Sequence, residues 1–86
     1  MPAISRFFGI VIDMYFKDQP PPHFHARYGE YEAFIAIRGP EVVRGWLPKR
    51  AGDMVLEWAA AHREELTVNW GRASEGLPLN PIPPLE

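Results

Sequence analysis

Two histidines on a predicted strand, His23 and His25, are the residues of this sequence whose type and spacing best suit chemistry. Side chains two positions apart on a strand point to the same face, with Cα atoms about 6–7 Å apart. Two imidazoles at that spacing can ligate one metal ion, such as zinc. The candidate third ligand is His62, on the apolar stripe of a predicted helix. It reaches the pair only if that stripe packs on the histidine face of the sheet.

The same pair also fits metal-independent cleavage of a phosphodiester. One imidazole would act as general base and the other as general acid, and Arg27 would stabilise the charged phosphorane. Ordinary structural roles carry more weight at this point, because surface histidines of a hairpin usually bond to backbone or water. Arg27 could equally form a cross-strand charge pair with Glu32, and His62 could fill the boundary between helix and sheet.

The hairpin that positions these side chains begins after three consecutive prolines, Pro20 to Pro22. Proline offers no N–H to a sheet, so strand pairing resumes at His23. Gly29-Glu30 reads as a two-residue loop with glycine at the position where a type II′ turn needs a positive φ. Counting outward from this turn places Arg27 opposite Glu32, and one face then collects the apolar side chains Phe24, Ala26, Tyr28, Tyr31, Ala33 and Ile35.

The remaining elements follow from composition and periodicity. Residues 6–17 are rich in β-branched and aromatic types and predict one long strand whose even positions face the core. Residues 31–37 and 41–47 predict two more strands, the last weakened by Gly45. Apolar residues at helical spacing predict a helix over about 49–73, with Pro48 at its start and Gly76 near its end.

Together these elements predict an α+β fold: a three- to four-stranded antiparallel meander with one long C-terminal helix packed on it. Residues 1–76 form this single domain. Residues 77–86 contain four prolines and predict an extended tail that covers its own domain or binds a partner.

Composition narrows the classes of protein. The chain has 86 residues, a net charge of −2 and no cysteine, so it lacks disulfides, thiolate nucleophiles and cysteine-ligated metal sites. No basic-then-apolar leader and no long apolar stretch is present, so we expect a cytoplasmic protein with no membrane partner. RNA binding would need a local basic patch; the candidates are Lys49, Arg50, Arg63 and Arg72.

Several motifs resemble a bacterial family, the domain of unknown function 4160. They are the N-terminal run from Met1 to Ile10, Pro21-Pro22-His23-Phe24-His25-Ala26 with Tyr28-Gly29, Leu47-Pro48-Lys49-Arg50-Ala51, Leu56-Glu57-Trp58-Ala59, His62-Arg63-Glu64-Glu65-Leu66 and Asn69-Trp70. Gln19-Pro20 and Gly52-Asp53 depart from the family's pattern, and the three histidines do not.

The resemblance implies no established activity. The family's genes are similar in size and setting to two-gene toxin–antitoxin modules. The resemblance therefore implies that this protein is a small component of such a module. It would bind a protein partner or a second copy of itself, with RNA as a further ligand. The alternative from the residues themselves is a histidine-dependent nuclease or a metal-dependent enzyme.

Overall fold

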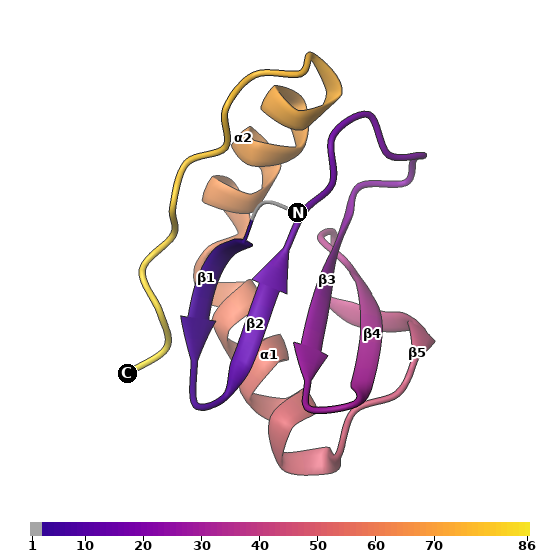
Figure 1. Cartoon of the computed structure of the whole chain (residues 1–86), viewed down its shortest axis with the longest axis vertical. Coiled ribbons are helices and arrows are strands. Elements are labelled where there is room, and N and C mark those ends of the chain that lie inside the picture. The colour runs from indigo at the N-terminus through magenta and orange to yellow at the C-terminus, as the bar shows by residue number, and fades with distance from the viewer. Residues whose placement is uncertain (1–2) are drawn as a thin grey trace.

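A computed structural model of the chain describes residues 3–86, and the first two residues of the expected domain 1–76 lie outside this range. Five antiparallel strands form one sheet in sequence order, and two helices lie across one of its faces (Figure 1). The elements are β1 Ala3–Phe7, β2 Ile10–Asp13, β3 His23–Tyr28, β4 Tyr31–Ala36, β5 Glu41–Gly45, α1 Lys49–Ala61 and α2 Arg63–Ser74. The predicted α+β meander is confirmed, but it has five strands instead of three to four and two helices instead of one.

The β3–β4 hairpin has the predicted register. Arg27 lies opposite Glu32 and Tyr28 opposite Tyr31. Gly29 has a φ of 59°, the positive value that the first position of the turn requires. Alternation along β3 therefore sends Phe24 and Ala26 to one face and the two histidines to the other.

The prediction of a single strand over residues 6–17 is wrong. The chain turns back at Phe8 and Gly9, whose φ values are 50° and 81°, so that β1 and β2 form a hairpin with a two-residue loop. Glycine adopts this left-handed conformation freely, whereas a bulky side chain does so at a cost. The Phe8 side chain is 61% exposed at the tip of this turn instead of facing the core.

The predicted helix over 49–73 is divided at His62, whose φ of −118° and ψ of 28° are not helical. Apolar spacing continues across this residue, from Trp58 and Ala59 to Leu66, and for that reason it predicts one helix. Pro48 precedes the first turn of α1. No helix within residues 3–86 is long and apolar enough to cross a membrane.

Both helices pack on the Phe24 face of the sheet. The Trp58 ring, fully buried in α1, lies 5.8 Å from the Phe24 ring and 5.4 Å from the Phe7 ring, measured between centroids. The core therefore lies between this face and the helices. No helix lies across the opposite face, which carries the histidines (Figure 1), but Trp70 of α2 reaches the His23 ring at the start of β3, 5.4 Å away between centroids.

The tail at residues 77–86 runs along β1 of its own domain (Figure 1). The Ile82 amide donates to the Ile4 carbonyl at 2.8 Å, and the Trp58 indole donates to the Pro83 carbonyl at 2.8 Å. The Ile82 side chain is buried in the core. Of the two roles expected for the tail, covering its own domain is the one that the structure shows.

Candidate functional site

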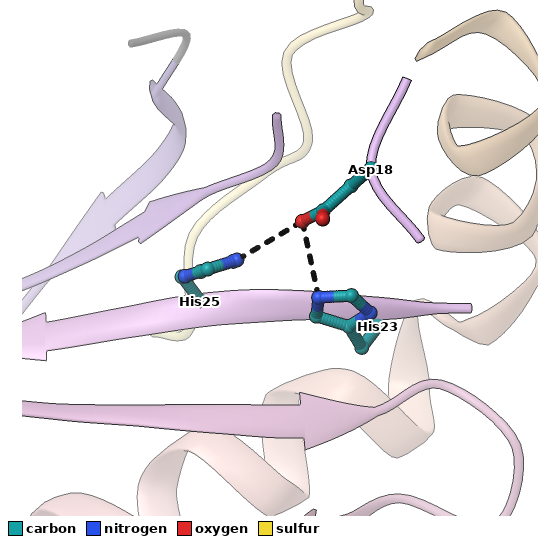
Figure 2. A group of neighbouring side chains, drawn as sticks. All are labelled: Asp18, His23 and His25. Carbon is teal, nitrogen blue, oxygen red and sulfur yellow. Dashed lines mark hydrogen bonds and ion pairs between the residues drawn. The ribbon is translucent and has the colours of Figure 1, made fainter. Parts of the chain in front are cut away.

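Three polar side chains converge on the face of the sheet opposite to Phe24 (Figure 2), where Trp70 of α2 borders them through its contact with the His23 ring. Asp18 comes from the loop that precedes β3, and its Oδ2 atom lies 3.1 Å from Nε2 of His23 and 3.4 Å from Nε2 of His25. The side chains of His23 and His25 are 12% and 8% exposed, and that of Asp18 is 29% exposed. The cluster is thus recessed but open to solvent on the Asp18 side.

The loop carrying Asp18 is attached to the domain at both ends. Before it, the Lys17 amide donates to the Ala73 carbonyl in the last turn of α2 at 3.0 Å. After it, the Pro22 carbonyl accepts from the Ile37 amide at 3.1 Å. Prolines 20–22 restrict the backbone between these points. The Asp18 carboxylate is therefore held over β3 by the fold.

The second nitrogen of each imidazole, Nδ1, lies next to an oxygen atom that can only accept a hydrogen bond. Nδ1 of His23 lies 2.9 Å from the Pro21 carbonyl, and Nδ1 of His25 lies 3.3 Å from a carboxylate oxygen of Glu32. A carbonyl or an ionised carboxylate requires a donor, so each Nδ1 is assigned the proton. In a neutral imidazole, Nε2 then carries a lone pair, and both lone pairs face Asp18.

The distances from Oδ2 of Asp18 to the two Nε2 atoms agree with coordination of one cation. Zinc bonds to histidine nitrogen and carboxylate oxygen are about 2.0–2.2 Å long, so adjacent ligand atoms lie roughly 3.0–3.5 Å apart. The two measured separations, 3.1 and 3.4 Å, fall in this range. Metal-bound histidines usually donate their other N–H to a carboxylate or carbonyl, as Glu32 and Pro21 allow here.

Aromatic side chains shield the cluster. The Tyr15 ring meets the His25 ring edge-on at 4.3 Å between centroids, and the Phe34 ring lies 4.2 Å from the His25 ring. Burial, with the nearby carboxylates of Asp13 and Glu32, raises the pKa of Tyr15. Burial also disfavours the charged form of Asp18, but the hydrogen bonds from the Gln19 amide and from His25, with the positive charge of His23 and His25 in their protonated forms, outweigh it, so the pKa of Asp18 is lowered.

Arg27, a predicted catalytic residue, forms an ion pair with a different carboxylate from the one expected. Its Nε donates to Oδ2 of Asp13 at 2.6 Å, across the β2–β3 pair, although its register partner is Glu32. Asp13 is fully buried, and its other oxygen has no hydrogen-bond partner among the described residues. The hydrogen bond that Arg27 donates to Asp13 raises the pKa of Arg27. Because Arg27 pairs with Asp13, the Glu32 carboxylate is available to pair with His25.

His62 does not join the other two histidines, which corrects the predicted three-histidine set. Its Nδ1 lies 2.5 Å from a carboxylate oxygen of Glu65, and its ring lies 5.6 Å from the ring of Trp58. The reason is that the helical stripe packs on the Phe24 face. Within residues 3–86, the group whose ligand atoms lie within 4.8 Å of one another is Asp18, His23 and His25.

Asp18 was not among the predicted site residues. The sequence offers one signal for it. Asp18 is a carboxylate five positions before His23, and the prolines between them return the chain toward the strand. Side-chain distance could not be read from it, because the path of a loop depends on where its ends are attached.

A cleft of about 420 Å³ opens beside the cluster, between the Asp18–Pro21 loop, the His23 and Phe34 rings and Arg44 of β5. A larger hollow of about 570 Å³ lies between Pro22, Ile37 and α2. Its lining is mostly apolar and includes none of the three clustered residues. The smaller cleft is therefore the one that adjoins ligating groups.

Comparison with curated proteins and comparison with solved structures gave no match. A family model does match the chain, over residues 9–71. This stretch includes Asp18 and all three histidines, and it confirms the resemblance that the motifs indicated. Because it covers well over half of the chain, the protein belongs to the family described as Domain of unknown function (DUF4160).

Proposed function

We propose that this protein binds a divalent transition-metal ion, zinc in the first place, through His23, His25 and Asp18. The observation that carries the proposal is the convergence of both Nε2 atoms on one carboxylate oxygen while both Nδ1 atoms have acceptors. Neutral imidazoles with the proton on Nδ1 direct two lone pairs at an anion, and only added protons or a cation make that arrangement favourable. A metal ion turns this repulsion into coordination.

The ligand set favours a catalytic site over a structural one. Structural zinc sites have four protein ligands, whereas catalytic sites have three and leave one position for water or substrate. Two imidazoles and one carboxylate are also the ligands of non-haem iron sites. The open position would face the cleft beside Asp18 and His23. The proposed function is therefore that of a metal-dependent enzyme, in which Asp18 takes the place of His62 as the third metal ligand.

Thermal unfolding of metal-stripped protein with added zinc tests this proposal. Zinc at one hundred times its Kd should stabilise the fold by about 2.7 kcal/mol. For a domain of this size that is roughly 10–20 °C in Tm. His25→Ala and Asp18→Asn should abolish the shift, and the matched control His62→Ala should keep it. An unchanged Tm in the wild type, or loss of the shift in His62→Ala alone, would refute the site.

A second candidate function is partner binding within a toxin–antitoxin-like module, and β5 favours it. Every residue of β5 is exposed, and the Val42 and Val43 side chains are 41% and 53% exposed. β5 is an edge strand, and the tail covers the opposite edge at β1. A bare apolar edge accepts an added strand, so the occupant we propose is an extended segment of a protein partner.

Co-expression with the product of the neighbouring gene tests this second function. Val42→Lys puts a charge on the edge and should reduce co-purification of that product. Val68→Lys, at a valine that is 55% exposed on α2, is the matched control and should retain it. Equal recovery with both variants would show that β5 is not the binding surface.

A further inference from the structure

We propose that the cleft beside the metal site binds a phosphate ester and that Arg44 is its second anion-binding group. This inference rests on the proposed metal site, which would hold one phosphoryl oxygen. Arg44 lies in β5 directly opposite Phe34 of β4, on the wall of the cleft across from the Asp18–Pro21 loop.

Arg44 is a cation held in place without an anion. Its guanidinium carbon lies 5.7 Å from the centre of the Phe34 ring, a separation typical of a cation–π contact. The Phe34 ring in turn stacks at 12° on the His23 ring, 5.8 Å away. None of the ion pairs found within residues 3–86 involves Arg44, whereas Arg27 and Lys49 each have a carboxylate partner.

The charges around the cleft select an anion. A divalent ion and the carboxylates of Asp18 and Glu32 cancel, and Arg27 and Asp13 cancel each other. Arg44 then leaves the loaded site with one excess positive charge. A phosphate monoester carries about −1.5 to −2 charges at pH 7, which this excess attracts.

The shape of the cleft favours an ester of phosphate over a bare anion. A guanidinium presents a planar fork of donors that matches phosphate oxygens, and the three terminal oxygens of a monoester can reach the metal and Arg44 together. The cleft volume of about 420 Å³ leaves room for an organic group. Phe34, Ala36 and Val43 give that group an apolar wall.

Calorimetric titration of the zinc-loaded protein with phenyl phosphate tests the inference. Benzoate offers the same ring with a carboxylate, and benzyl alcohol offers it without a charge. We expect phenyl phosphate to bind at least tenfold more tightly than benzoate, and benzyl alcohol not to bind. Arg44→Gln should weaken phenyl phosphate about 10- to 100-fold, as expected for loss of a charge-assisted bidentate contact. The affinity of Arg44→Lys for phenyl phosphate should lie between those of the wild type and Arg44→Gln, because lysine keeps the charge and loses the planar fork of donors.

Two controls separate the failure of this inference from failure of the metal site. Zinc affinity is measured first in each variant and should stay within about threefold of the wild type in Arg44→Gln. Arg50→Gln, at an exposed arginine in the first turn of α1, should bind phenyl phosphate like the wild type. Tight zinc binding with equal phenyl phosphate affinity in wild type and Arg44→Gln would overturn the phosphate inference and leave the metal site standing.

Competition then identifies the source of the phosphate. Displacement of phenyl phosphate by a short single-stranded oligoribonucleotide with a 5′-phosphate would assign the cleft to the terminal phosphate of RNA. Displacement by uridine monophosphate but not by the oligoribonucleotide would assign it to small organic phosphates. Equal displacement by benzoate would overturn the choice of phosphate.

Discussion

Asn69 should contribute more to stability than its small polar side chain suggests, because it holds the tail through backbone bonds. It is fully buried in α2, donates to the Asn80 carbonyl at 2.8 Å and accepts from the Asn80 amide at 2.9 Å. Asn69→Ala removes both bonds and leaves two backbone groups of the tail without partners. At about 1–2 kcal/mol for each, the free energy of unfolding should fall by about 2–4 kcal/mol.

This loss is large for so small a protein. A domain of 86 residues is expected to have a total stability of roughly 4–13 kcal/mol. Urea unfolding followed by circular dichroism gives the change in free energy. Hydrogen exchange of the Ile82 amide, which donates to Ile4 of β1, reports directly whether the tail has detached. We expect that exchange to accelerate in Asn69→Ala.

The matched control is Asn80→Ala. The bonds to Asn69 come from the backbone of Asn80, which the substitution retains, and the Asn80 side chain is exposed. Its cost should be within about 0.5 kcal/mol. The reasoning is refuted if Asn69→Ala costs no more than Asn80→Ala, or if exchange of the Ile82 amide does not change.

Three further substitutions test other local features. Arg27→Met should destabilise the fold by removing the partner of the buried Asp13, and Asp13→Asn in the same chain should restore part of the loss in urea unfolding. Gly45→Ala should lower Tm sharply, since Gly45 has a φ of 82° and an added Cβ would lie 2.9 Å from Cα of Ala33; an unchanged Tm would contradict that contact. Phe8→Asn should raise Tm by relieving a left-handed phenylalanine, and a lower Tm would show that the exposed ring stabilises the turn.

The sequence predicted best where turn chemistry and alternation agree. In the β3–β4 hairpin, Gly29 supplies the positive φ and the apolar alternation selects the face, so the register was predictable to the residue. The prediction from the sequence failed at Phe8, because a phenylalanine in a left-handed turn opposes its own conformational preference. A strand prediction reads such a residue as a continuation of the strand.

The candidate site was predictable only in part, for reasons of packing. Alternation places His23 and His25 on one face of β3, but it cannot say which face a helix will cover. Burial of Trp58 against Phe24 decided this and carried His62 to the other side. Asp18 enters the site because Lys17 is bonded to α2, a tertiary contact that no local pattern encodes.

That bond between the Lys17 amide and the Ala73 carbonyl couples two distant parts of the chain. Fraying of the last turn of α2 would release the backbone next to Asp18 and so move a proposed ligand away from the two imidazoles. By thermodynamic linkage, an ion that prefers the assembled cluster must suppress that fraying by the same free energy. The end of α2 thus shares in metal affinity without touching the metal, and substitutions there tune the site from a distance.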